Sequence, residues 1–265
     1  MSTHINQEPV VAVVVAAGSG VRFGGAVPKA LVELAGRPLV RHSVEALTAG
    51  GVERVVVVIA DDLRSDFAEA LKGVAVPVDL VAGGARRQDS VRAGLEALTA
   101  TMAGDSAVVL VHDAARPLVP QHVVRAVIDA VDSGQWAVVP AVPVVDSIRE
   151  LAVLDGVGDE GSSVVDRSRL RAVQTPQGFD LDSLLAAHRV VADSDEELTD
   201  DAAVMERVGQ RVTIVPGSRE SLKVTEPIDL ALAEAVLAQR GTEQRGTGQR
   251  GTEQRGTGLG GKEQA

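Results

Sequence analysis

The chain of 265 residues contains no cysteine, and its only aromatic side chains are three phenylalanines and one tryptophan. Without cysteine it can form neither disulfides nor thiolate metal sites. Because aromatic rings are so few, the core must be built from Val, Leu, Ile and Ala. The abundance of these residues in short runs favours parallel strands that are buried on both faces.

The sequence also lacks long apolar runs and an excess of positive charge. No run reaches the length that spans a membrane, and residues 1–9 have neither the charged nor the apolar region of a signal peptide. We therefore expect a cytoplasmic protein. The formal net charge of −11 argues against general nucleic-acid binding, which depends on basic patches. It does not exclude small anionic ligands, because these respond to local charge.

Apolar runs alternate with helical patterns up to about residue 142. The runs predict strands, and the apolar spacings of three and four between them predict helices. This order predicts an α/β fold with a doubly wound, mainly parallel sheet, in which ligands bind beyond the carboxyl ends of the strands. The predicted strands are 10–16, 54–59, 78–81, 107–111 and 137–142, and the predicted helices are 38–49, 61–72, 86–100 and 120–133.

The rhythm changes after Pro143. Short β-like pieces flank a turn rich in Gly and Asp, which predicts a hairpin that projects from the sheet as an arm at about 143–170. Further on, the pattern predicts helices at 181–192, 199–208 and 227–239, and a strand at 211–215. We therefore expect one domain at 10–238, preceded by a flexible N-terminus at 1–9.

The C-terminal segment is different in kind. Residues 239–258 repeat a five-residue unit, QRGTE or QRGTG, without any apolar side chain. Because such a segment cannot bury surface to offset its ordering entropy, we predict that 239–265 is a disordered tail. The alternative is an electrostatic tether that uses its arginines.

A glycine-rich loop follows the first predicted strand, in "VAVVVAAGSGVRFGGAVPK" at 11–29. It is not a dinucleotide fingerprint, because Phe23 takes the place of the third glycine. It is not a P-loop either, because Ala26 stands where a lysine is required. What remains is a backbone whose N–H groups can approach phosphate oxygens, with Arg22 as a bidentate partner and Lys29 as a point charge. The alternative is a surface connection whose glycines only allow a tight turn.

Six segments carry a resemblance to a known family. "AAGSGVRFGGAVPK" resembles the signature of nucleotidyltransferases that join a nucleoside triphosphate to a sugar or alditol phosphate. It is followed in order by "AGGARRQDSV", "VHDAARP", "VDRSRLRAVQTPQ", "TDDAAVME" and "LKVTEPIDL". Together these segments, over residues 10 to 238, are similar to the 2-C-methyl-D-erythritol 4-phosphate cytidylyltransferases of the non-mevalonate isoprenoid pathway.

The resemblance implies a Rossmann-like sheet of the nucleotidyltransferase type and a homodimer formed through the arm. It also implies transfer of a cytidylyl group from CTP to 2-C-methyl-D-erythritol 4-phosphate with release of pyrophosphate. Three alternatives remain open. One is a ribitol 5-phosphate cytidylyltransferase, which "HDAARP" and "VDR" disfavour. Another is an enzyme that transfers a uridylyl group, or a cytidylyl group to a different acceptor. The third is a catalytically inactive nucleotide-binding regulator, which the four charged residues Arg22, Lys29, Asp113 and Lys223 argue against.

The resemblance also implies a set of site residues. Arg22 and Lys29 stabilise charge at the α-phosphorus, and Lys223 approaches the phosphates. The nucleotide is bound by Ala16, Ala17, Gly18, Gly20, Gly84, Ala85, Ser90 and Ala114. The acceptor is bound by Arg116, Ser147, Arg167 and Thr175, of which Ser147 and Arg167 act in the active site of the other subunit.

Asp113 and Glu220 are the predicted metal ligands. Asp113 closes a buried strand, where a carboxylate suits Mg²⁺, although an aspartate there can also cap the next turn. Glu220 and Lys223 are three residues apart, a spacing that also forms surface pairs.

Other residues carry structural predictions or departures from the family. His112 is expected to be a structural hydrogen-bond donor, and Thr199 to cap a helix with two aspartates in its first turn. Ala85 stands where the family commonly has an acidic residue, which puts base selectivity in question. Ser147 stands where the family often has threonine, so a hydroxyl is kept.

Overall fold

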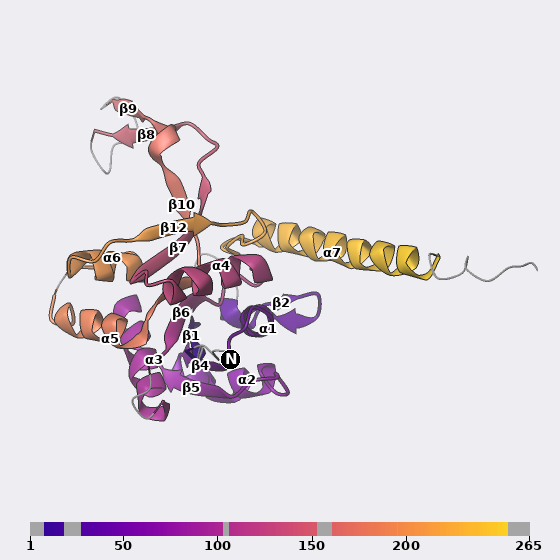
Figure 1. Ribbon diagram of the computed structural model, residues 1–265, viewed down its shortest axis with the longest axis horizontal. Helices are drawn as coiled ribbons and strands as arrows, with labels where there is room; N and C mark the ends of the chain where they lie inside the picture. The colour runs from indigo at the N-terminus through magenta and orange to yellow at the C-terminus, as the bar shows by residue number, and fades with distance from the viewer. Residues whose placement is uncertain (1–7, 19–27, 103–105, 153–160, 195, 254–265) are drawn as a thin grey trace, which may run out of the picture.

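The computed structural model describes residues 8–18, 28–102, 106–152, 161–194 and 196–253 (Figure 1). Its centre is an eight-stranded sheet with the order β10-β7-β11-β6-β1-β4-β5, and β12 pairs with β7. The parallel part joins β6 to β1, β1 to β4 and β4 to β5, and β12 also runs parallel to β7. These parallel strands are β1 (Val10–Val15), β4 (Arg54–Ile59), β5 (Val78–Ala82), β6 (Val108–Asp113), β7 (Ala137–Pro143) and β12 (Thr213–Pro216).

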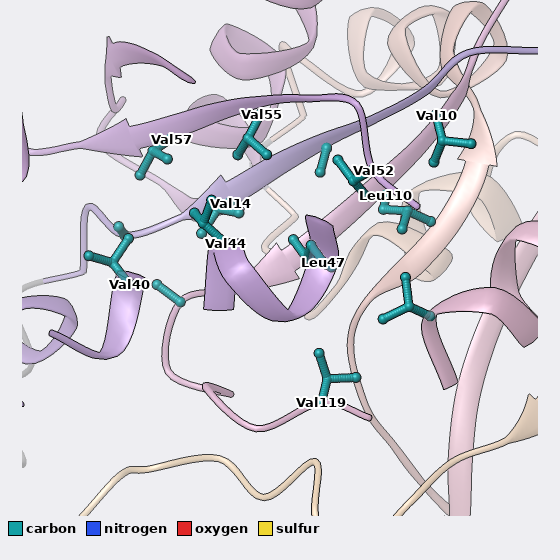
Figure 2. Close-up of a cluster of buried hydrophobic side chains, with 14 of the residues drawn as sticks. Val10, Val14, Val40, Val44, Leu47, Val52, Val55, Val57, Leu110 and Val119 are labelled. Atoms are coloured by element: carbon teal, nitrogen blue, oxygen red, sulfur yellow. The ribbon is translucent and has the colours of Figure 1, made fainter. Parts of the chain in front are cut away.

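Helices cover both faces of the sheet. One apolar core lies between the sheet and α1, α2 and α4, and a second lies between the sheet and α3, α5 and α6. Figure 2 shows the first core, in which side chains of α1 meet those of β1 and β4. The helices are α1 (Leu39–Ala49), α2 (Arg64–Ala70), α3 (Arg87–Thr101), α4 (Gln121–Asp132), α5 (Leu181–Val190) and α6 (Asp201–Arg207).

Strand β1 explains why its sequence is apolar without interruption. Val10, Ala12 and Val14 belong to the first core, whereas Val11 and Val13 belong to the second. Because successive side chains of a strand point to opposite faces, a strand between two helical layers needs apolar residues at every position. The doubly wound, mainly parallel sheet predicted from the sequence is confirmed.

Helix α3 packs unusually close to β1 at Gly94. A Cβ atom at this position would lie 2.6 Å from the Val13 Cγ1 atom. Glycine therefore lets the helix approach the strand. This close packing fixes the N-terminal end of α3, which borders the site described below.

Two strands of the central sheet were not predicted. β10 (Arg171–Val173) and β11 (Gln177–Asp180) pair with β7 in the antiparallel direction, and β11 also separates β7 from β6. β11 is only four residues long and has polar residues at both ends, so it lacks the apolar run that marks the other strands. A small hairpin of β2 (Glu33–Leu34) and β3 (Arg37–Pro38) was missed for the same reason.

The arm predicted near 143–170 is present. β8 (Ile148–Leu151) and β9 (Ser162–Val165) form an antiparallel hairpin that projects from the body of the molecule (Figure 1). Its polar and apolar residues are mostly exposed, because neither face of the hairpin packs on the sheet.

The last helix is longer than predicted. Helix α7 (Pro227–Glu253) begins on the body, where Ala233 is fully buried, and continues past the expected end at residue 239. The helix therefore ends at Glu253 and not at residue 239, while disorder of the tail stays a prediction. The repeat contains no proline, and Gln, Arg and Glu are good helix formers, so a helix nucleated on the body can extend into it. Residues 1–7 and 254–265 lie outside the described residues, and flexibility at both ends stays a prediction.

Candidate nucleotide-binding and catalytic site

A pocket of about 300 Å³ lies at the carboxyl ends of β1 and β6. These strands end side by side, since Val15 is the register partner of Asp113. The α/β architecture predicts a ligand site at this edge of the sheet. The pocket brings together many of the predicted site residues, namely Ala16, Ala17, Gly18, Lys29, Gly84, Ala85, Ser90, Asp113, Ala114 and Lys223.

The carboxylate of Asp113 faces two cationic side chains of this pocket. Its Oδ2 atom lies 2.7 Å from Lys223 Nζ, and its Oδ1 atom lies 4.0 Å from an Arg87 Nη2 atom. Burial alone would raise the pKa of Asp113, but the cations of Lys223 and Arg87 outweigh it and hold the pKa below its ordinary value. The carboxylate is therefore ionised at neutral pH.

Thr175 and His112 support Asp113 from below. The Thr175 hydroxyl accepts the backbone N–H of Asp113 at 3.1 Å and lies 3.1 Å from His112 Nδ1. His112 Nε2 lies 3.1 Å from the Arg116 carbonyl, which can only accept, so Nε2 carries the proton and Nδ1 accepts from Thr175. Burial lowers the pKa of His112 to about 4, which keeps the ring neutral.

This network involves two residues that the sequence analysis singled out. His112 is a structural hydrogen-bond donor, as expected. Thr175 is 6% exposed, and its hydroxyl bonds to Asp113 and lies beside His112. Its contact with the acceptor stays a prediction.

The Gly83–Gly84 turn forms another wall of the pocket. The Gly84 N–H donates to Ser90 Oγ at 3.1 Å, and Ser90 Oγ donates to the Arg86 carbonyl at 3.2 Å. A Cβ atom on Gly84 would lie 2.4 Å from Asp89 Cβ, so only glycine fits there. Asp89 accepts the Arg86 N–H at 3.2 Å, which satisfies the first turn of α3.

Arg87 joins the pocket to the helices behind it. It lines the pocket, and its Nη2 atom lies 2.8 Å from Asp201 Oδ2. Asp201 is fully buried and accepts from His188 Nε2 at 3.1 Å. Burial would raise the pKa of Asp201, but Arg87 and His188 lower it to about 2.

The start of α6 differs in detail from the prediction. The side chain of Asp200, and not that of Thr199, caps the helix by accepting the Ala203 N–H at 2.9 Å. Asp201 was expected only to complement the helix dipole, but it forms the ion pair with Arg87 described above. The difference arises because Arg87 comes from α3, which sequence spacing could not place beside α6.

Arg116 and Glu220 lie outside the lining of this pocket. Arg116 donates to the Ser221 carbonyl at 2.7 Å, and burial holds the pKa of its guanidinium below the ordinary value. The Glu220 carboxylate accepts from Arg240 Nε of α7 at 2.7 Å. The alternative of a surface pair between Glu220 and Lys223 is not seen, since Lys223 pairs with Asp113 and Glu220 with Arg240. The structure does not bring Glu220 to the predicted metal site.

The predicted acceptor residues of the arm lie away from the pocket. Ser147 and Arg167 are both exposed and neither lines the pocket, and the Arg167 guanidinium donates to the Val145 carbonyl. Arg22 and Gly20 lie outside the described residues. The structure therefore assembles the predicted nucleotide residues within one chain and leaves the arm residues apart from them.

The sequence reasoning missed several pocket residues. Val15, Ala30, Ala115, Arg86 and Arg87 line the pocket but were not predicted as site residues. Arg87 carried a usable signal, because it follows a Gly-Gly turn and begins a helix at the carboxyl edge of the sheet. The small apolar residues carried none, since they look like ordinary strand ends.

The comparisons with known proteins agree with this geometry. Residues 10–239 match the profile of the family described as 2-C-methyl-D-erythritol 4-phosphate cytidylyltransferase. This chain belongs to that family. Two relatives that carry the family's name come from Saccharopolyspora erythraea, with 49% identity over 231 residues, and Streptomyces avermitilis, with 48% over 236. The alignments cover 86% of this chain in both cases, and 99% and 92% of the respective relatives.

Solved structures of the family share the fold. The cytidylyltransferase of Thermus thermophilus superposes with a TM-score of 0.68 at 33% identity, covering 86% of this chain and 98% of that one. A 4-diphosphocytidyl-2C-methyl-D-erythritol synthase from Anaerococcus prevotii superposes with a TM-score of 0.74 at 25% identity, covering 88% and 99%. The Rossmann-like fold of the nucleotidyltransferase type, predicted from the motifs, is confirmed.

The family establishes the reaction. The chain is a cytidylyltransferase that moves a cytidylyl group from CTP to 2-C-methyl-D-erythritol 4-phosphate in isoprenoid biosynthesis, releasing pyrophosphate and forming 4-diphosphocytidyl-2-C-methyl-D-erythritol. The prediction made from the six segments is confirmed over the ribitol 5-phosphate and regulator alternatives. None of the described helices is long and apolar enough to cross a bilayer.

Proposed function

We propose that CTP lies in the pocket with its triphosphate across Lys29, Asp113 and Lys223 and its base beside the Gly83–Gly84 turn. The presence of all three charged side chains in the lining of one pocket, with Lys223 paired to Asp113, carries the proposal. The acceptor phosphate is already a nucleophile, so the reaction needs no strong base. The protein's work is to position the two phosphates and to neutralise their charge.

In-line attack by the acceptor phosphate adds negative charge at the α-phosphorus of CTP. Lys29 lines the pocket at the start of the short helix η2 (Lys29–Leu31). We assign stabilisation of that charge to Lys29 together with Arg22, and contact with the other phosphates to Lys223. Cations preorganised in a partly buried site act strongly because they need no reorganisation during the reaction.

A magnesium ion fits the residues present. No group of three or more His, Asp or Glu side chains that could hold a metal occurs among the described residues. Mg²⁺ does not need such a group, because it binds through one or two carboxylates together with substrate phosphates. Asp113 is ionised and lines the pocket, so we assign it as the protein ligand. The ion would neutralise triphosphate charge and stabilise the leaving pyrophosphate.

Base selection falls to the backbone of the turn and to Ser90. Ala85 has no side-chain acceptor for the cytosine amino group, so a contact there must use its carbonyl. Ser90 Oγ accepts from Gly84 N–H and donates to the Arg86 carbonyl, which leaves it one acceptor lone pair. We propose that this short wall admits a pyrimidine and excludes a purine by size.

The acceptor site is completed by a second copy of the chain. Ser147 and Arg167 are exposed on or beside the arm and away from the pocket of their own chain. Arm residues Val145, Leu151 and Val164 are between 49% and 71% exposed. Such apolar exposure favours a protein contact. We propose a homodimer in which each arm delivers Ser147 and Arg167 to the partner's pocket, where Arg116 also faces the acceptor. A cytoplasmic location stays a prediction from the sequence.

The test is pyrophosphate release from CTP with two acceptors in parallel. We expect release with 2-C-methyl-D-erythritol 4-phosphate and none with ribitol 5-phosphate. Chelation with EDTA should abolish release, and added Mg²⁺ should restore it. Full activity in EDTA would contradict the magnesium assignment, and equal use of both acceptors would contradict the acceptor site.

A further inference from the structure

The guanidinium of Arg87 lies between the carboxylates of Asp201 and Asp113 and is closer to that of Asp201. Its Nη2 atom is 2.8 Å from Asp201 Oδ2 but 4.0 Å from Asp113 Oδ1. The Arg87 side chain is 27% exposed and reaches the pocket, whereas Asp201 is fully buried and does not line it. Any influence of Asp201 on the pocket must therefore pass through Arg87.

Asp201 is itself fixed on both sides. Its Oδ2 atom accepts from Arg87, and its Oδ1 atom accepts from His188 Nε2 at 3.1 Å, with the His188 side chain 1% exposed. The three residues come from α3, α5 and α6, which pack together in the second core. Asp201 is therefore a fixed anchor that holds the guanidinium in one place.

Because Asp201 holds Arg87, Lys223 can pair with Asp113 without competition from Arg87. Among the described residues, Asp113 and Asp201 are the carboxylates that form ion pairs with Arg87. If Asp201 lost its charge, Asp113 would be the remaining carboxylate within that reach, and Arg87 would move toward it. A guanidinium binds a carboxylate through two parallel N–H groups and competes strongly with an ammonium. Lys223 would then lose its 2.7 Å contact with Asp113.

We propose that Arg87 is a positioning residue, anchored by Asp201 and His188, that stays at a distance from Asp113 so that Asp113 and Lys223 keep the arrangement that binds the CTP triphosphate. This inference rests on the CTP pocket proposed above. Arg87 also places a positive charge beside the triphosphate. In this arrangement Asp201, which is buried and does not contact substrate, fixes the positions of the charged groups of the pocket through Arg87.

The experiment compares wild type with Asp201→Asn, Arg87→Lys, Arg87→Gln and the Arg87→Gln/Asp201→Asn double variant. CTP binding is measured by calorimetry without acceptor, kcat and KM for CTP by pyrophosphate release, and folding by the thermal midpoint. Arg207→Gln is the control, because it breaks an exposed ion pair with Glu196 from the same helix as Asp201. Wild type must bind CTP; failure there would sink the proposed pocket and not this inference.

Asp201→Asn should lower kcat/KM for CTP about tenfold or more at temperatures where the variant is folded. Arg87→Lys, at a partly exposed site, should also lower it, and Arg207→Gln should not. In the double variant, the asparagine should add no further loss to that of Arg87→Gln, since Asp201 acts through Arg87.

Two results would overturn the inference. One is an unchanged kcat/KM for CTP in folded Asp201→Asn or in Arg87→Lys, which would leave only a structural role. The other is losses that multiply in the double variant, which would mean that Asp201 acts independently of Arg87.

Discussion

The pocket and the arm differ in where their charged side chains find partners. In the pocket, Asp113 pairs with Lys223, and Arg87 pairs with buried Asp201, all within one chain. On the arm, Arg167 is exposed and donates to a backbone carbonyl, and no ion pair of the described residues includes it. This difference fits our proposal that the nucleotide half of the site is built within one chain, whereas the acceptor half needs the arm of a second chain.

The largest effect is expected for Lys29→Ala, a substitution in the pocket. We expect kcat to fall about a thousandfold, because removal of one preorganised charge at the reacting centre has effects of this size. The fold should persist, since Lys29 is only half-buried. Steady-state kinetics and circular dichroism test this, with Lys72→Ala, at a side chain that is 74% exposed, as the control. Turnover near that of wild type would remove the assigned role.

A substitution on the arm should affect the acceptor and not CTP. Arg167→Ala should raise KM for the acceptor about ten- to a hundredfold, which corresponds to a lost charge-assisted hydrogen bond, and leave the affinity for CTP unchanged. Arg149→Ala is the matched control, because Arg149 lies on the same arm and bonds to Ser162 Oγ at 2.7 Å. Equal losses toward both substrates would contradict the separation of the two halves.

The apolar residues of the arm provide a smaller effect. Val164→Glu should weaken self-association several-fold, because a charge at a buried contact is costly. Val190→Glu is the control, since Val190 on α5 is 73% exposed and Val164 is 71% exposed. Sedimentation velocity at a series of concentrations measures both. An identical sedimentation profile for the two variants would argue against the arm as the dimer contact.

The smallest expected effect is a pH dependence of the free energy of unfolding, caused by Asp201 behind the pocket. The pKa of Asp201 is about 2 in the folded protein, below its ordinary value of 3.8. Its stabilising contribution is therefore fully present above about pH 4 and is lost as the pH falls toward 2. Urea unfolding between pH 5 and 2.5 should show a shallower decline for Asp201→Asn than for wild type. Asp62→Asn, at an exposed position, should decline as wild type does.

Much of the fold could be predicted from the apolar pattern. Strands β1 and β4 and most of β6 and β7 are buried on both faces, so their sequences are largely apolar. The structure places all the parallel strands within about two residues of the prediction. β11 could not be found in this way, because its Gln177 and Asp180 look like loop residues and it is stabilised by pairing with β6 and β7. The length of α7 was missed because its repeat has no apolar face.

The site residues also divide into those that the local sequence predicts and those that depend on contacts between distant segments. The strand-end position of Asp113 and the glycine turn at Gly84 marked pocket residues, because local sequence shapes both. The pair of Arg87 with Asp201 was missed, since the two residues are 114 positions apart and meet only because α3 and α6 both pack on α5. Thr175 was assigned to the acceptor by resemblance, and its hydrogen bond with the Asp113 N–H could not be predicted because the two residues are far apart in the sequence.

The central claim is that each active site combines the pocket of one chain with the arm of another. The direct test mixes Lys29→Ala subunits with Arg167→Ala subunits after reversible dissociation and measures pyrophosphate release at low acceptor concentration. Random pairing gives mixed dimers in which the arm of the first subunit serves the intact pocket of the second. We predict recovery of roughly a quarter of wild-type activity, since half the dimers are mixed and each has one complete site. A mixture no more active than the sum of its parts would contradict the claim.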